Sequence, residues 1–194
     1  MDPHNSADAV LESCRQGDPE AFRVLFETYR ERVFSIALVF FHGDTSIAGD
    51  VTQQVFLKLM TRVAQFESRA DFSTWLHRLV TNTCLDKHRR QRRWVLFGSA
   101  AKAETIGPAA PARSSVEEEY SQREMSLAVQ RAIGELRPKF RITILLKYFD
   151  DLSYEEMSVV LQVSKGTVAS RLNRGHRMLA KKLAHLGYAQ GAEV

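Results

Sequence analysis

The stretch from Asp71 to Arg93 changes character halfway along, and this change restricts most strongly what the chain can fold into. Its first half carries apolar residues at the three- and four-residue steps of one helix face, and Asp71 stands where a helix N-cap acceptor belongs. These residues are Phe72, Trp75, Leu76, Leu79, Val80 and Thr83. Its second half is cationic, with Lys87, His88, Arg89, Arg90, Arg92 and Arg93. The pattern predicts a helix with one end in a core and the other on an anion such as phosphate, although cations also complement a helix dipole or form a solvated face.

Composition narrows the class of protein further. The chain of 194 residues is 44% hydrophobic, which suits one large or two small folded domains. Its 27 Lys and Arg exceed its 23 Asp and Glu, and this modest positive charge favours an acidic partner. Cys14 and Cys84 are far apart and predict neither a disulfide framework nor a zinc site.

The longest apolar run, residues 36–41, is too short to cross a bilayer, and the first residues lack a signal-peptide pattern. These features predict a protein of the reducing cytoplasm, without membrane insertion, cofactor or small-molecule substrate.

The N-terminal half carries signals for two helices before Asp71. Asp18, Pro19 and Glu20 are an N-cap, a first-turn proline and a first-turn acid, and they begin a helix that runs to about Phe41. A turn at 42–44 leads to an amphipathic helix. Its polar side holds Asp50, Gln53, Gln54, Lys58 and Arg62. With the helix after Asp71, these predict a three-helix unit around one core.

The C-terminal half follows residues 96–114, whose Ala, Gly, Pro and Ser predict a flexible linker. Ser115 and Glu118 form a capping box for a helix that ends near Leu136, and another helix is expected from Pro138 to Phe149.

The final segment predicts a helix-turn-helix. Ser153 and Glu156 form a capping box for a helix over 154–161, and after a tight connection Ser164 caps a longer helix. The outer face of this last helix is basic or polar, and it holds Lys165, Ser170, Asn173, Arg174, Arg177 and Lys181. Two basic helices favour DNA binding, although a helical hairpin with a solvated basic side has the same pattern.

Four stretches resemble the extracytoplasmic-function (ECF) sigma factors of bacterial RNA polymerase, in the sigma-70 family. They read AFRVLFETYRERVFSIA, DVTQQVFLKLM, FSTWLHRLVTNTCLDKHRRQRR and LRPKFRITILLKYFDDLSYEEMSVVLQVSKGTVASRLNRGHRMLAKKL. The resemblance implies an all-α fold of two small helical domains joined by a flexible linker. The expected parts are a region 2 bundle of three to four helices over 1–95, the linker over 96–114, a region 4 helix-turn-helix domain over 115–188, and a tail over 189–194.

The resemblance also implies a binding site for core RNA polymerase, on the segment that docks on the clamp helices of its largest subunit. Its candidates are Asp50, Gln53, Gln54, Phe56 and Lys58. Gln54 stands where the family usually has a glutamate, which removes a charge there.

Two DNA sites follow from the same resemblance. The minus-ten element would be bound by Phe66, Ser68, Arg69, Asp71, Arg78, Asn82, Lys87, Arg89 and Arg90, with a flipped base held near the loop and phosphates held by the cations. The minus-thirty-five element would be read in the major groove by Lys165, Thr167, Ser170, Arg171, Asn173, Arg174 and Arg177. Ala169 departs from the basic residue that relatives often carry, and Trp75 is expected in the core rather than as a stacking platform.

The predicted function is therefore an alternative sigma factor that directs core polymerase to promoters, with promoter DNA and an anti-sigma factor as partners. A helix-turn-helix regulator that acts without polymerase is the alternative. An enzyme is disfavoured, because the histidines are dispersed and the sequence has no glycine-rich phosphate loop or metal-ligand cluster.

Overall fold

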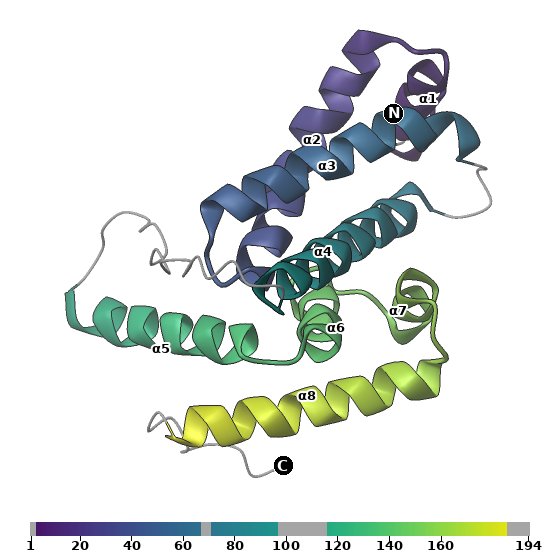
Figure 1. The fold of residues 1–194 in the computed structure, drawn as a ribbon. Coiled ribbons are helices and arrows are strands. Elements are labelled where there is room, and N and C mark those ends of the chain that lie inside the picture. The colour runs from purple at the N-terminus through teal and green to yellow at the C-terminus, as the bar shows by residue number, and fades with distance from the viewer. Residues whose placement is uncertain (1–2, 67–70, 97–115, 186–194) are drawn as a thin grey trace.

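A computed structural model describes residues 3–66, 71–96 and 116–185, and all regular elements in these ranges are helices (Figure 1). The N-terminal half consists of α1 (Pro3–Arg15), α2 (Pro19–Phe40), α3 (Thr45–Arg62), the short 3-10 helix η1 (Val63–Gln65) and α4 (Phe72–Leu96). The C-terminal half consists of α5 (Val116–Gly134), α6 (Pro138–Tyr148), α7 (Tyr154–Leu161) and α8 (Lys165–His185). The all-α prediction is confirmed. The linker beyond residue 96, Ser115 and the tail lie outside the described residues.

Aspartate side chains cap the start of α2 and α3, at Asp18 as predicted and at Asp44, which was predicted only as part of a turn. The Asp18 side chain accepts a hydrogen bond from the Glu20 amide at 2.9 Å, and Asp44 accepts one from the Ile47 amide at 2.8 Å. Between α2 and α3, His42 and Gly43 take positive φ angles of 61° and 85°. This tight turn lets α3 fold back along α2, and their facing sides form the centre of the bundle.

The sequence patterns did not predict α1. This helix packs on α2 and η1, and it buries Leu11 and Cys14, which are 5% and 1% exposed. At its end, Arg15 donates a hydrogen bond to the carbonyl oxygen of Phe66, just before the segment that leads to α4. The bundle of the N-terminal half therefore has four helices.

The helix-turn-helix of the C-terminal half forms as predicted. Ser153 and Glu156 make both hydrogen bonds of the capping box, Gln162 ends α7 in the left-handed conformation, and the Ser164 hydroxyl accepts the Thr167 amide at 3.2 Å. At Gly175, a Cβ atom would lie 3.2 Å from the Ile144 side chain. The glycine therefore lets α8 pack closely against α6.

The two halves pack against each other and share a continuous set of buried apolar residues. Helix α2 contacts α5 and α6, and α4 contacts α6 and α7 (Figure 1). The sequence predicted the two groups of helices but not how they sit together. None of the helices in the described ranges is long and apolar enough to cross a membrane.

Candidate nucleic-acid and polymerase interfaces

The outer face of α8 is exposed along its first three turns. Asn173, Arg174 and Arg177 are exposed, while Val168 and Leu172 on the opposite side are buried at 0% and 2% exposure. Among the described residues, no hydrogen bond or ion pair occupies these three polar side chains, so they can contact an external partner.

The other predicted α8 residues make contacts within the protein. Lys165 forms an ion pair with Glu155 of α7, and the Thr167 hydroxyl lies 3.0 Å from that of Ser164. Ser170 donates to the Thr167 carbonyl oxygen at 3.0 Å, and Arg171 is half-buried. The exposed ion pair and hydroxyl contacts are weak enough to exchange for contacts with a ligand.

A polar hollow of about 620 Å³ lies between the end of α3 and the first half of α4. It brings together two residues that the sequence assigned to minus-ten DNA, Arg78 and Asn82. Thr61, Arg62, Trp75 and Leu79 line the rest of it. Sequence reasoning placed Arg62 on the polar side of α3 but included neither it nor Thr61 in the site, because the contact of these two helix ends has no signature along the chain.

Aromatic residues support one side of this hollow. Trp75 is half-buried, and its ring lies 5.3 Å from that of Phe66 and 5.8 Å from that of Phe72. Phe66 and Phe72 are each 7% exposed, so both belong to the core. Trp75 packs on Phe66 and also lines the hollow. Asp71 accepts the Ser73 amide at 3.4 Å as the first residue before α4. Ser68 and Arg69 lie outside the described residues.

The cationic end of α4 is partly neutralised by neighbouring acids. Lys87 pairs with Asp50 of α3 at 3.0 Å, and Arg89 pairs with Asp86. Arg90 is exposed and has no such acidic neighbour among the described residues. Asp50 is therefore part of the same charge network as the predicted DNA residue Lys87.

The exposed face of α3 differs in part from the predicted polymerase site. Gln53 is exposed and Gln54 half-buried, but Phe56 is only 8% exposed and stacks edge-on against Phe26 at 4.8 Å. Lys58 points toward α4, where it donates to the Thr83 hydroxyl at 2.9 Å. The surface instead presents two apolar side chains, Leu57 and Met60, which are 56% and 53% exposed. Their three-residue spacing places them on one face of α3, a pattern that could have identified them.

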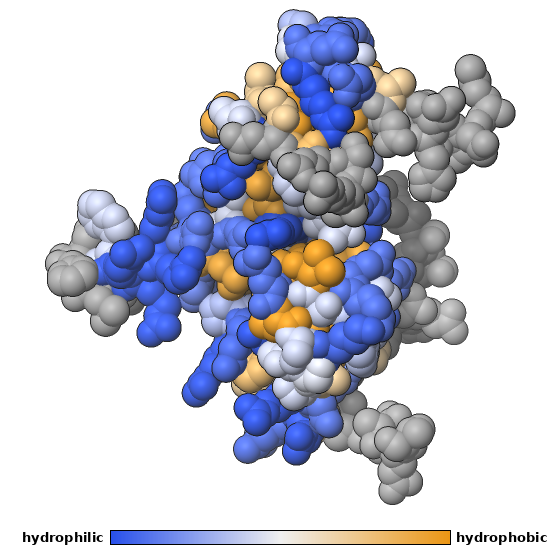
Figure 2. Space-filling view, turned by 90° about the vertical axis from the view of Figure 1, so that its right-hand side faces the viewer, coloured by the Kyte–Doolittle hydropathy of each residue, from blue (hydrophilic) through white to orange (hydrophobic). Residues whose placement is uncertain are grey.

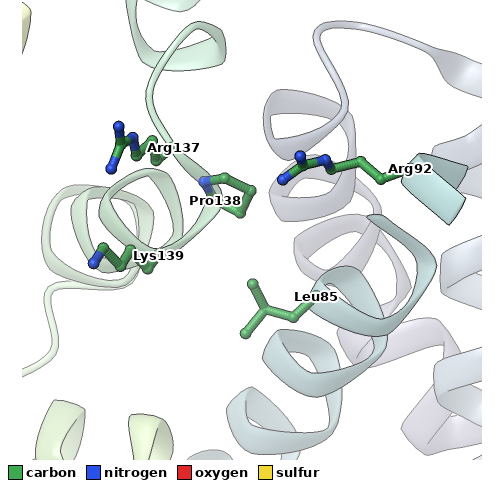
Figure 3. A pocket seen from close by; sticks show the side chains of 5 residues that line it. All are labelled: Leu85, Arg92, Arg137, Pro138 and Lys139. Carbon is green, nitrogen blue, oxygen red and sulfur yellow. The ribbon is translucent and has the colours of Figure 1, made fainter. Parts of the chain in front are cut away.

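A second hollow lies at the contact of the two halves, between α4 and the start of α6 (Figure 3). Leu85 and Arg92 border it from α4, and residues 137–139 border it from α6. The charged ends of Arg137 and Lys139 point away from that of Arg92, so the three cations do not converge on one ligand (Figure 3). On the face drawn in Figure 2, hydrophilic surface predominates and hydrophobic surface forms small, separate patches.

Comparison with known proteins decides what these surfaces belong to. The sigma-70 region 2 family model matches residues 25–94, and the sigma-70 region 4 model matches residues 126–179. The chain is 30% identical over 181 residues to the ECF RNA polymerase sigma-E factor of Escherichia coli K12, which covers 91% of this chain and 94% of the relative. The chain belongs to the ECF RNA polymerase sigma factors. It is also 28% identical over 180 residues to the ECF sigma factor SigW of Bacillus subtilis, over 91% of this chain and 96% of the relative.

Two solved structures share the fold of this sigma factor. The Bartonella quintana sigma factor RpoE, solved with the anti-sigma factor NepR, has a TM-score of 0.69 at 19% identity and covers 84% of this chain and 96% of its own. CnrH, solved with the cytosolic domain of CnrY, has a TM-score of 0.65 at 21% identity and covers 91% of this chain and 96% of its own. The region 2 match lies within α2 to α4, and the region 4 match lies within α5 to α8. The two halves are called region 2 and region 4 below.

Two titratable side chains, Cys84 and His77, are buried in the interior of this sigma factor. Burial raises the pKa of the Cys84 thiol to about 12, which keeps it protonated and unreactive. His77 is 4% exposed and lies beside Asp150, and Ser73 contacts its ring at 3.4 Å. The described part of the chain contains no group of three or more His, Cys, Asp or Glu that could hold a metal ion.

Proposed function

We propose that this sigma factor uses three separate surfaces to bring core RNA polymerase to a promoter: the exposed face of α3, the hollow between α3 and α4, and the outer face of α8. The observation that carries the proposal is the exposure, on two different halves of one chain, of cationic and polar side chains with few internal partners. A chain with two such DNA surfaces gains affinity when a larger enzyme holds both in place.

The α3 face is the proposed contact for the clamp helices of the largest polymerase subunit. Leu57 and Met60 supply an apolar centre, with Gln53, Gln54 and Asp50 at its edge. Such an arrangement is typical of a protein interface, in which an apolar core is surrounded by polar groups. Phe56 and Lys58 support this face indirectly, because Phe56 packs on Phe26 of α2 and Lys58 donates to Thr83 of α4.

The hollow between α3 and α4 is the proposed site for minus-ten single-stranded DNA. Asn82 can donate to and accept from a base, and Arg78 and Arg62 can hold phosphates on either side. Trp75 offers an aromatic edge to an unstacked base. Lys87, Arg89 and Arg90 continue the positive track, while Phe66 and Asp71 fix the start of α4.

The outer face of α8 is the proposed reader of the minus-thirty-five element. Arg174, Arg177 and Asn173 are long or polar enough to reach base edges from a helix in the major groove. Lys165, Thr167, Ser170 and Arg171 suit phosphate contacts near the start of the helix, where exposed amides add to the attraction for anions.

The chain is proposed to act in the cytoplasm and to carry out no reaction itself, since polymerase supplies the chemistry. One neighbour of the same fold, the sigma factor RpoE of Bartonella quintana, was solved with the anti-sigma factor NepR, which supports an anti-sigma partner for this chain as well. A regulator acting without polymerase is not favoured, because it leaves the region 2 match over residues 25–94 without a role.

Run-off transcription tests the proposal. Purified core polymerase plus this chain, on a library of promoter sequences, should give transcripts from one class of promoter, and core alone should give none of them. A chain that binds promoter DNA but neither binds core polymerase nor yields transcripts would instead be a helix-turn-helix regulator that acts without polymerase.

A further inference from the structure

Helix α1 lies outside the part of the chain that the region 2 family model matches, which begins at residue 25. It nevertheless packs on α2 and η1, and it buries Leu11 and Cys14. These contacts make α1 part of the folded N-terminal half. None of the three proposed binding surfaces includes a residue of α1, so the function proposed above gives this helix no role.

The last residue of α1, Arg15, contacts Phe66 in two ways. One terminal nitrogen of its guanidinium donates to the Phe66 carbonyl oxygen, and the guanidinium carbon lies 5.7 Å from the centre of the Phe66 ring. The first contact is a hydrogen bond from a charged donor, and the second is a cation–π contact. Arg15 therefore holds both the backbone and the ring of a residue that lies 51 positions away in the sequence.

The Phe66 carbonyl needs a donor from outside its own segment. Phe66 follows η1, and its amide donates to the Val63 carbonyl oxygen of that short helix at 3.0 Å. A buried carbonyl beyond the end of a helix must be satisfied by another group, and Phe66 is 7% exposed. Among the described residues, Arg15 supplies this hydrogen bond.

A role within α1 alone does not explain Arg15. It also pairs with Glu12 at 2.9 Å, three residues earlier on the same helix. Ion pairs at this spacing contribute little when they are exposed. The Glu12 side chain is 55% exposed, whereas that of Arg15 is 25% exposed and packs on Phe66. The contact that buries Arg15 thus crosses from α1 to Phe66.

Phe66 in turn supports the wall of the hollow between α3 and α4. Its ring lies 5.3 Å from that of Trp75 and 5.9 Å from that of Phe72, and we call these three residues the aromatic cluster. Trp75 lines the hollow, while Arg15 does not. A change in the position of Phe66 would therefore reach the hollow through the Trp75 ring, since packed aromatic rings prefer particular relative orientations.

We propose that Arg15 is a positioning residue for minus-ten recognition: it holds Phe66 from the end of α1, and Phe66 holds the Trp75 ring in the wall of the hollow. The inference rests on the proposed binding of minus-ten DNA in that hollow. A ring that is already fixed loses little freedom when a base contacts it, which raises the affinity for the strand. Without Arg15 the ring must be ordered on binding, and a displacement of about 1 Å is enough to weaken a contact of this kind.

Trp75 fluorescence tests the first half of this proposal in the free chain. The sequence has two tryptophans, and Trp94→Phe leaves Trp75 as the only one. Trp94 is 72% exposed, so its replacement disturbs little packing. In this background, Arg15→Gln should shift the Trp75 emission to longer wavelength, because the loosened ring meets more water. Arg15→Lys can still donate to the Phe66 carbonyl oxygen but lacks the planar guanidinium, so its shift should be smaller.

Affinity of the polymerase complex for single-stranded minus-ten DNA tests the second half. The probe is a fluorescently labelled non-template strand of a promoter selected in the run-off library, added to core polymerase bound to each variant. Arg15→Gln should weaken strand binding about tenfold, and Arg15→Lys about threefold. Affinity for core polymerase should not change, because the proposed core contact on α3 contains no residue of α1. A variant that is merely unfolded would lose both affinities.

Arg23→Gln is the matched control for both measurements. Arg23 also pairs with a glutamate three residues earlier, Glu20, but it lies on α2 and its side chain is 58% exposed. Its ion pairs within the described ranges are with Glu20 and Glu27. The control thus removes the same charge without a change next to the aromatic cluster. It should leave the Trp75 emission and the strand affinity unchanged.

The proposal requires the emission shift and the loss of strand affinity to occur together. It is overturned if Arg15→Gln matches the control in either measurement, or if this variant loses affinity for core polymerase to the same extent as for the strand. Failure of the proposed function would look different. The wild-type complex with core would then not bind the strand, and yet Arg15→Gln would still shift the Trp75 emission of the free chain.

Discussion

Arg174 lies on the exposed face of α8, where a guanidinium can reach a base pair in the major groove. Arg174→Ala should therefore cost about 1–3 kcal/mol at one position of the minus-thirty-five element and relax the preference there. Run-off transcription from promoters varied at each position measures this. Lys181→Ala, an exposed cation farther along the helix, should weaken binding evenly. An even loss for Arg174→Ala as well would assign that residue to phosphate instead.

Single residues were predictable where their role depends on near neighbours in the chain. Asp18, Ser153 and Ser164 cap helices as expected, because a cap needs only the next few amides. Lys58 was expected at the surface but turns toward Thr83, which is 25 residues away. Contacts across helices decide such cases, and no local pattern records them.

At the scale of an element, α3 presents Leu57 to solvent, and the residue is 56% exposed. Leu57→Asp should lower affinity for core polymerase by about tenfold or more, as loss of a central apolar contact does. The free energy of unfolding should change little, because the side chain packs on little in the chain alone. Equilibrium binding to core and urea unfolding measure the two effects.

Val159 supplies the control for this change. It is similarly exposed, at 52%, but lies on α7 of region 4. Val159→Asp should keep the affinity for core that the α3 variant loses. Equal loss in both variants would point to a general effect of the added charge, and the α3 face would no longer be the proposed contact.

The first turn of α7 depends on its capping box. The Ser153 hydroxyl accepts the Glu156 amide at 3.2 Å, so Ser153→Ala should lower the free energy of unfolding by about 1 kcal/mol. Ser158→Ala is a suitable comparison, since that hydroxyl donates only to the Glu155 carbonyl oxygen within the helix and should matter less. Thermal unfolding followed by circular dichroism measures both. Similar losses would mean that the cap contributes nothing beyond an ordinary hydroxyl.

Helices were predictable where apolar residues recur at helical spacing along the sequence. This pattern located α2, α3, α4 and the pair α7 and α8 within a few residues. It did not reveal α1, where Leu11 and Cys14 are the main buried residues of a short and otherwise polar segment. It also did not predict that three polar residues of α4, Thr74, His77 and Thr81, are buried, at 9%, 4% and 1% exposure.

For the whole molecule, the arrangement of the two halves could not be obtained from the sequence. Local patterns predict the two proposed DNA-binding surfaces, because each lies on one or two helices. One contact between the two halves joins Arg32, His77 and Asp150, which are separated by 45 to 118 residues and belong to no motif. Because all three side chains are polar, the sequence alone suggests that they lie on the surface.

The stability of the folded chain should depend on pH through Asp150, whose side chain is 1% exposed and lies between Arg32 of α2 and His77 of α4. Burial by itself would raise the pKa of this carboxyl, but hydrogen bonds and charges from His77 and Arg32 outweigh burial and hold the pKa below its usual value of 3.8. The folded state thus keeps the carboxylate ionised to lower pH than the unfolded state does. Its contribution is complete above about pH 4 and is lost as the pH falls through the lowered pKa.

Urea unfolding of the wild type and Asp150→Asn at several pH values measures this contribution. The free energy of unfolding of the wild type should exceed that of the variant by about 1 kcal/mol at pH 7 and by the same amount at pH 5. The difference is no larger because the side chain of Arg32 is 48% exposed, and solvent weakens its attraction to the carboxylate. The gap should narrow as the pH falls below about 4, because the wild-type carboxyl takes up its proton there. Asp151→Asn, changed in the same way at an exposed position, should show no such narrowing. A gap that stays constant into strong acid would mean that the charge of Asp150 does not hold the two halves together.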